Sequence, residues 1–445
     1  MGATFTEKIL ARKAGVASAK AGDILDVEPD VVLSHDNTAA IEKTFRQLPH
    51  GDIKHPERVA ITLDHTAPAP TPRHAELHDQ IRKFVAEQGI TNFYEVGRGI
   101  CHQVISEEAL ISPGKMLVGA DSHSPHYGWM GAFGAGIGRT EVAAVWATGQ
   151  LWMRVPETLR VTLTGELRRG VMSKDFTLSL IGQLSSEGAN YMAVQFDGEG
   201  AHNLSIDSRM VLANMMAEMG AKNAYMAPDE DTFAWLEKQL RRSGRYADDA
   251  AIANRIVQFR EEALYSDEDA EYAAHHTIDL SAIEPAVARP HHVDNVVPLS
   301  DVAGLNVDVG FIGTCTNGRL EDLTAAAEVI RGKKLSRRLI IVPASSQVME
   351  DASRNGVLGD LLAAGATLGT PGCGPCLGNH MGVLAPGEVC ISSANRNFQG
   401  RMGQREAEIY LSNPAVVAAS ALVGKITHPD EIQWSPDGET DNYQS

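Results

Sequence analysis

Two short stretches carry three cysteines in a pattern that could hold an iron–sulfur cluster. Cys315 stands in the middle of residues 313–317, and Cys373 and Cys376 form a Cys-x-x-Cys pair. Soft thiolate ligands select iron–sulfur clusters or zinc over hard cations. A cubane cluster has four irons, so three thiolates would leave one iron free to bind a substrate oxygen. The cysteines therefore predict a [4Fe–4S] cluster that serves Lewis-acid chemistry rather than electron transfer.

The Cys-x-x-Cys pair also has two other interpretations, a redox pair and half of a structural zinc site. Structural zinc needs four protein ligands, and without a second such pair only His380 could complete the set. A thioredoxin-like pair follows a first strand and opens a helix, whereas glycines and Pro375 place this pair in an open loop. The cluster interpretation is favoured over both.

Residues suited to acid–base chemistry follow three short apolar runs in the first third of the chain. They are Asp64 and His65 after residues 59–63, His102 beyond residues 93–96, and Asp121, Ser122 and His123 beyond residues 116–119. A carboxylate that accepts an imidazole N–H fixes the tautomer of the ring and favours its charged form. One such histidine alone would more often be a satisfied loop residue, but three at equivalent strand ends indicate a shared site.

Alternating strands and helices must position these residues. Leu77, Ile81, Phe84 and Val85 share one helical face, and Gly89 ends that helix. Such alternation predicts an α/β protein with mainly parallel sheets, which bind ligands beyond the carboxyl ends of their strands. The same alternation returns after about residue 296. There the apolar runs are residues 307–312, 339–342, 366–368 and 389–393.

Changes of pattern along the chain predict three α/β domains, at residues 1–155, 156–290 and 296–434, and a loose tail at 435–445. In the second domain, residues 158–164 alternate as a half-exposed strand does, and residues 191–196 predict another. Four methionines there fit the core face of a helix better than a cofactor site. They are Met210, Met215, Met216 and Met219.

The net charge of −18 argues against nucleic-acid binding, because phosphate contacts need clustered basic residues. An anionic substrate would need local cations, and Arg396 and Arg401 are close enough in sequence to clamp one carboxylate. No apolar stretch approaches the length of a membrane span, and five cysteines are too few for a disulfide framework. We expect a cytoplasmic protein without a membrane anchor.

Taken together and in order, these motifs resemble the aconitase superfamily, in particular the separate large subunits of the 3-isopropylmalate dehydratase and homoaconitase type. The likeness runs nearly end to end. It rests on residues 5–9, 99–103, 119–123, 313–319, 372–376 and 395–398. The resemblance implies a hydro-lyase that moves a hydroxyl between adjacent carbons of a hydroxy di- or tricarboxylate through an alkene. A dehydratase of another malate derivative, such as dimethylmalate, and a cluster-bearing sensor without turnover are the alternatives.

The resemblance also implies a role for each site residue. Three cysteines would hold the [4Fe–4S] cluster: Cys315, Cys373 and Cys376. The acid–base groups would be the Asp64–His65 pair, the His102–Asp121 couple, and His123. Substrate contacts would come from His35, Ser122, Asn395, Arg396 and Arg401.

Two departures from the family pattern add expectations. Single-chain aconitases continue into a mobile fourth domain with a serine base, and this chain stops before it, so we expect a separate small subunit as partner. The second departure is Gln195, where the family has a glutamate. We expect Gln195 to lie beside His123 and to leave it a weaker base, because an amide offers only a neutral hydrogen bond.

Overall fold

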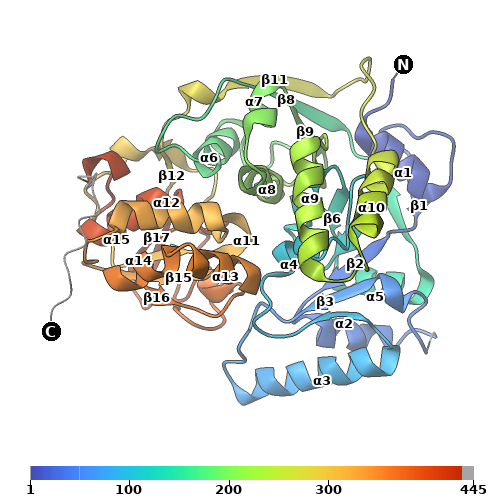
Figure 1. Ribbon diagram of the computed structural model, residues 1–445, viewed down its shortest axis with the longest axis horizontal. Helices are drawn as coiled ribbons and strands as arrows, with labels where there is room; N and C mark the ends of the chain where they lie inside the picture. Colours follow the sequence, from blue (N-terminus) through green and yellow to red (C-terminus); the bar gives the residue numbers. More distant parts are fainter. Residues whose placement is uncertain (1, 50, 433–445) are drawn as a thin grey trace.

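The protein is a mixed α/β structure built on three mainly parallel sheets, as the alternation of patterns predicted (Figure 1). The computed structural model describes residues 2–49 and 51–432. The N-terminal part, blue to cyan, and the C-terminal part, orange to red, lie at opposite sides of the molecule. The predicted tail at 435–445 lies outside the described residues. The predicted domain limits stay a prediction.

The first sheet has five parallel strands in the order β4-β3-β2-β5-β6. Their bounds are Asn92–Tyr94, Val59–Thr62, Val31–Ser34, Met116–Gly119 and Phe133–Gly136. The helices of this part are α1 (Phe5–Ala14), α2 (Thr38–Phe45), α3 (Pro72–Gln88), α4 (Cys101–Glu107) and α5 (Arg139–Thr148). Phe45, Phe84 and Trp146, from α2, α3 and α5, pack ring against ring in one core with the strands. An antiparallel ribbon of β1 (Ile24–Val27) and β7 (Leu151–Arg154) flanks it.

The second sheet has four parallel strands in the order β10-β9-β8-β11. Their bounds are Asn223–Met226, Ala193–Asp197, Thr158–Thr164 and Ala274–Asp279. The helices are α6 (Ser173–Leu184), α7 (Glu199–Asn203), α8 (Ile206–Met215), α9 (Glu230–Ser243) and α10 (Asp249–Glu262). The four methionines of α8 and of the following 3₁₀ helix Met216–Met219 are fully buried, so their predicted place in the core is confirmed.

The third sheet has seven strands in the order β13-β12-β18-β17-β14-β15-β16, and the five from β18 to β16 run parallel. Their bounds are Val296–Pro298, Ala286–Ala288, Glu408–Leu411, Val389–Ser392, Val309–Ile312, Arg338–Ile341 and Thr367–Leu368. The helices are α11 (Thr314–Asn317), α12 (Leu320–Ile330), α13 (Ser346–Arg354), α14 (Val357–Ala364) and α15 (Pro414–Val423).

One hydrophobic core joins all three sheets. It includes Leu33 from the first, Val161 from the second and Phe311 from the third, and it also contains Cys315 and Cys373. Loops at the carboxyl ends of strands in the first and third sheets therefore meet around shared packing. Among the helices of the described residues, none has the length and apolar character that crossing a membrane requires.

Candidate active site

The loops that follow the strands of the first and third sheets enclose a cavity of about 230 Å³. Its walls contain nearly every site residue that was predicted from the sequence. The predicted residues that line it are His35, His65, His102, Asp121, Ser122, His123, Cys315, Cys373, Cys376, Asn395, Arg396 and Arg401. Asp64 lies directly behind the wall, bonded to His65. Residues up to 366 positions apart in the chain are thus brought into one site.

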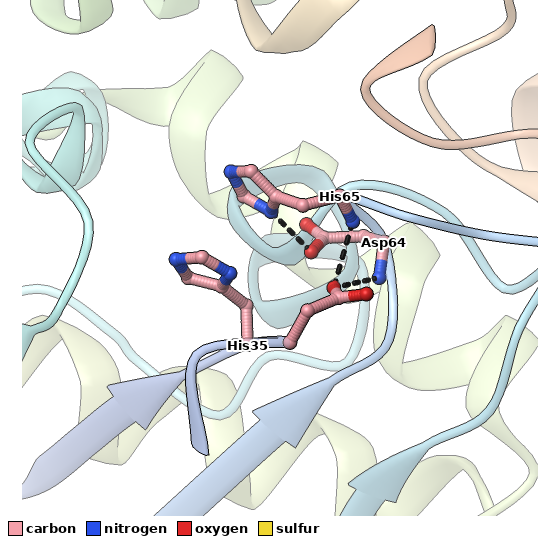
Figure 2. Close-up of side chains that lie close together, drawn as sticks. His35, Asp64 and His65 are labelled. Carbon is pink, nitrogen blue, oxygen red and sulfur yellow. Dashed lines mark hydrogen bonds and ion pairs between the residues drawn. The ribbon is translucent and has the colours of Figure 1, made fainter. Parts of the chain in front are cut away.

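Asp64 and His65 form a buried couple at the end of β3 (Figure 2). Oδ1 of Asp64 lies 2.6 Å from Nδ1 of His65, and Oδ2 accepts the backbone N–H of Cys101 at 2.7 Å. Burial alone would lower the pKa of His65, but the charge of Asp64 and the neighbouring acceptors raise it well above its usual range. The raised pKa favours the protonated form of His65, which can donate a proton into the cavity.

Asp36 holds this couple in place, and the sequence argument did not include it. Its Oδ2 accepts the backbone N–H groups of Asp64 at 2.9 Å and His65 at 2.8 Å, and its Oδ1 that of Thr66 at 3.0 Å. Nε2 of His78 lies 2.8 Å from the same carboxylate. The hydrogen bond with His78 and the charges of His65 and His35 outweigh burial and hold the pKa of Asp36 well below its usual range. The sequence signal for this role was the position of Asp36, two residues beyond the end of β2.

His35 stacks on His65 with the ring centroids 3.7 Å apart, and its tautomer follows from its contact with Asn37. The amide orientation of Asn37 is set because Oδ1 accepts the N–H of His35 while Nδ2 donates to the carbonyl of Ala120 at 2.9 Å. Nδ2 also lies 2.8 Å from Nε2 of His35, so Nε2 accepts and Nδ1 carries the proton. Nδ1 is a buried donor without a protein partner among the described residues.

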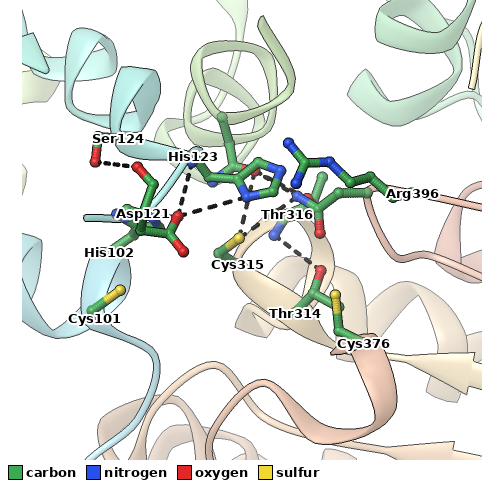
Figure 3. Close-up of polar contacts among 12 residues, drawn as sticks. Cys101, His102, Asp121, His123, Ser124, Thr314, Cys315, Thr316, Cys376 and Arg396 are labelled. Carbon is green, nitrogen blue, oxygen red and sulfur yellow. Dashed lines mark hydrogen bonds and ion pairs between the residues drawn. The ribbon is translucent and has the colours of Figure 1, made fainter. Parts of the chain in front are cut away.

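Asp121 is shared by the neighbouring histidines (Figure 3). Its Oδ1 lies 2.7 Å from Nε2 of His102 and accepts the backbone N–H of His123 at 2.8 Å. Its Oδ2 is 3.5 Å from Nε2 of His65. Burial would raise the pKa of Asp121, but these histidines lower it well below its usual range. Asp121 is thus an ionised carboxylate that connects the loops after β3 and β5 and the start of α4.

The expectation for Gln195 is wrong. The partner of His123 is Glu218, whose Oε1 lies 2.7 Å from Nε2 of His123 and also bonds Nε of Arg396 at 2.9 Å. Burial would raise the pKa of Glu218, but His123 and Arg396 lower it to about 2. Gln195 instead bonds Ser266 at 2.7 Å and the hydroxyl of Tyr272 at 2.9 Å. His123 therefore has the carboxylate that the sequence argument assumed to be missing.

Glu218 was missed because it lies among the buried methionines, where helical periodicity indicates only core. Asp197, two positions after Gln195, is a nearby carboxylate, but it has other partners. Its Oδ2 accepts from Nε of Arg160 at 2.7 Å and its Oδ1 from the hydroxyl of Thr162 at 2.6 Å.

The three cysteines form a donor set that fits an iron–sulfur cluster. Cys315, Cys373 and Cys376 are each at most 7% exposed, and all line the cavity. Nδ2 of Asn395 lies 3.6 Å from Sγ of Cys315, and Nη2 of Arg401 lies 3.4 Å from Sγ of Cys376. N–H donors to sulfur stabilise cluster thiolates. Burial raises the pKa of Cys315 to about 12, so the ligand form of this thiol needs a metal to displace the proton.

The chain belongs to the aconitase family. The model of the aconitase family (aconitate hydratase) matches residues 7–304 and 300–424, which is most of the sequence. The family implies an iron–sulfur cluster, and the cysteine set fits that implication.

Relatives at close to half identity are named as large subunits. A 3-isopropylmalate dehydratase large subunit of Methanopyrus kandleri is 46% identical over 96% of this chain and 99% of its own. A probable methanogen homoaconitase large subunit of Methanosarcina mazei is 50% identical, with coverages of 91% and 99%. The homoaconitase large subunit of Thermus thermophilus is 48% identical, with coverages of 97% and 99%. These names include two different substrates at similar identity.

Replacing Glu218 by glutamine should lower kcat of the active enzyme by about 100-fold, within the range of a positioned acid–base group. The change keeps the shape but removes the charge that pairs with His123 and Arg396. Gln195→Glu is the matched control and should bring no gain, because Gln195 contacts Ser266 and Tyr272. Steady-state kinetics measure both effects. A gain with Gln195→Glu together with no loss for Glu218→Gln would show that Gln195, and not Glu218, acts on His123.

Replacing Asp36 by asparagine should destabilise the protein by about 1–3 kcal/mol at pH 7, because buried N–H groups lose a charged acceptor. The pKa of Asp36 is depressed in the folded state, so its stabilisation is fully present above its unfolded pKa of about 4. The difference from wild type should therefore shrink as the pH falls below about 4. Thermal unfolding at pH 7 and across this acid range measures both effects. Equal stability at pH 7 contradicts the anchoring role of Asp36.

Proposed function

We propose that this chain is the cluster-binding large subunit of a hydro-lyase of the 3-isopropylmalate dehydratase and homoaconitase type. The observation that carries the proposal is a single cavity lined by three buried cysteine thiols, carboxylate–imidazole couples and two arginines. Family membership supports the reaction class. Cys315, Cys373 and Cys376 would hold a [4Fe–4S] cluster, which supplies a Lewis-acidic iron for the substrate hydroxyl and carboxylate when bound.

The cations of the cavity bind the substrate carboxylates. Arg396 is oriented by Glu218 through its Nε atom, and Arg401 is held between Cys376 and the ring of Phe398. Both side chains line the cavity, where a guanidinium can donate two parallel hydrogen bonds to a carboxylate. Ser122 and the Nδ1–H group of His35 add donors for the remaining oxygens. A chain with a net charge of −18 thereby presents local positive charge to an anionic substrate.

His65 delivers the proton in the dehydration step. The C–O bond of the substrate breaks, the departing hydroxyl takes the proton from His65 and leaves as water, and a base removes a proton from the adjacent carbon to give the alkene. Asp64 keeps the ring oriented, and Asp121 faces its other nitrogen. Addition of water to the alkene in the opposite sense then places the hydroxyl on the neighbouring carbon. The base comes from the partner.

The partner is a small subunit that completes the site. The large-subunit names of the relatives and the match over 99% of the length of three of them support this division of labour. The substrate is a hydroxy acid of the 3-isopropylmalate or homocitrate kind. The partner contributes to the pocket for the side chain that distinguishes them.

The cysteine assignment predicts about four irons per chain in anaerobically purified protein, as a cubane requires. Replacing Cys315, Cys373 or Cys376 by serine should abolish the cluster, because each removes one of only three thiolates. Cys101→Ser and Cys390→Ser are the matched buried controls and should retain the iron. Iron analysis and visible absorption check both results. Stoichiometric zinc without charge-transfer absorption would contradict the assignment.

The proposed partner predicts that the purified chain alone has little or no dehydratase activity even with a full cluster. Adding the small subunit should restore turnover of 3-isopropylmalate or homocitrate, measured through the absorbance of the alkene product. The chain with a Cys315→Ser replacement serves as the control that the small subunit is not active by itself. Full activity of the cluster-loaded chain without any partner would refute the division of labour.

A further inference from the structure

Lys174 is a buried cation in a place where electrostatics disfavours one. It lies in the first turn of α6 and has 0% exposure. The N-terminal end of a helix carries partial positive charge, so a lysine there is destabilising, and burial adds a desolvation penalty. The neighbouring Asp175 anchors this turn to the third sheet, because it accepts the N–H of Ala286 at 3.0 Å and Nδ2 of Asn413 at 2.7 Å. The ammonium is therefore held in a fixed place.

The Nζ atom of Lys174 is bonded to backbone and sulfur. It donates to the carbonyl of Ala394 at 2.7 Å and of Ser393 at 3.1 Å, and Sδ of Met215 lies 3.8 Å away. No ion pair to a carboxylate is formed by Lys174 among the residues that the structure describes. By contrast, buried Arg209 has Asp229 at 2.8 Å. Lys174 thus has hydrogen-bond acceptors but no direct counter-ion.

The two carbonyls that Lys174 holds come immediately before two site residues. Asn395 follows Ala394, and its Nδ2 atom reaches Sγ of Cys315 at 3.6 Å and Oδ1 of Asn214 at 2.8 Å. Arg396 comes next and bonds Glu218. Loss of the ammonium would leave two buried carbonyls without a donor and would free the loop that carries Asn395 and Arg396.

Most of the negative groups that act on Lys174 belong to the site. Burial lowers the pKa of Lys174 to about 8, while Glu218, Asp322, Cys315 and Cys376 act to raise it. Met215 also links the two regions, because its Sδ atom lies 3.9 Å from the hydroxyl of Thr316, next to Cys315. A dipositive cubane core bound by three thiolates has a net negative charge, which a nearby buried cation stabilises.

We propose that Lys174 is a positioning residue of this site, whose ammonium both fixes the loop of Asn395 and Arg396 and supplies a counter-charge to the thiolate-bound cluster. The inference rests on the proposed function, because it requires the cluster at Cys315, Cys373 and Cys376.

The test separates charge from hydrogen bonding with three variants of the full chain, purified without air and loaded with iron and sulfide. Lys174→Gln keeps a donor but removes the charge, Lys174→Met removes both, and Lys174→Arg keeps both. The midpoint potential of the cluster, followed by paramagnetic resonance during a redox titration, is the main measurement. Lys174→Gln and Lys174→Met should make it more negative, because the reduced cluster loses a stabilising cation, and Lys174→Arg should restore it.

Binding to the assembled enzyme gives a second measurement. Lys174→Met should raise KM for the hydroxy acid by about tenfold more than Lys174→Gln, because the loop of Arg396 loses its donor. Lys222→Met is the control, since Lys222 is a partly buried lysine that likewise donates to a backbone carbonyl, that of Gly136 at 3.1 Å. Its loss should not move the potential.

The outcomes separate a failure of the proposed function from a failure of the proposed role of Lys174. A wild-type chain that takes up no cluster refutes the proposed function. A wild-type cluster whose potential is unchanged in Lys174→Gln overturns the role of Lys174, and so does an equal shift in Lys174→Arg. If Lys174→Met does not fold, which circular dichroism shows, Lys174→Gln against Lys174→Arg decides the question.

Discussion

Buried charge is the constraint on which this structure depends. The cavity between the first and third sheets contains ionised carboxylates, and a carboxylate removed from water must be paired or hydrogen bonded. Asp64, Asp121 and Glu218 each meet an imidazole, at 2.6 to 2.7 Å. Asp36 does not line the cavity itself, and yet it accepts three backbone N–H groups that shape the turn of Asp64 and His65. The same hydrogen bonds and ion pairs therefore stabilise the buried charges and position the groups for acid–base chemistry.

Parallel sheets make this arrangement possible. A parallel strand ends on the same edge as its neighbour, so the residues just beyond β2, β3 and β5 collect at one edge. The edge formed by β14 and β17 does the same for Cys315 and for the loop of Asn395 and Arg396. The two edges face each other across the cavity because one hydrophobic core joins the sheets. The second sheet contributes Lys174 and Glu218 from helical segments that pack beneath the site.

Prediction from the sequence succeeded where the relevant residues are neighbours in the chain. Met116–Gly119 and Thr158–Thr164 form strands with the expected bounds, because apolar runs and alternation are local signals. Asp64 and His65 are adjacent in the chain, so the end of a predicted strand was enough to predict that they pair. It failed for Gln195, because its sequence context placed it beside His123 while the strand β9 directs it to Ser266 and Tyr272. The side chain that does pair with His123 lies 95 positions away.

The sequence by itself determined the chemical types in the site, the alternation that makes an α/β fold, and the strand ends where the reactive residues lie. Only the tertiary structure decided which partner each charged group has. Lys174 bonds a carbonyl 220 positions away, and Arg396 bonds a glutamate 178 positions away. Periodicity records which face of an element is buried, whereas the partner of a buried charge depends on how separate elements pack against one another. Glu218 looks like core in the sequence and becomes part of the site only through that packing.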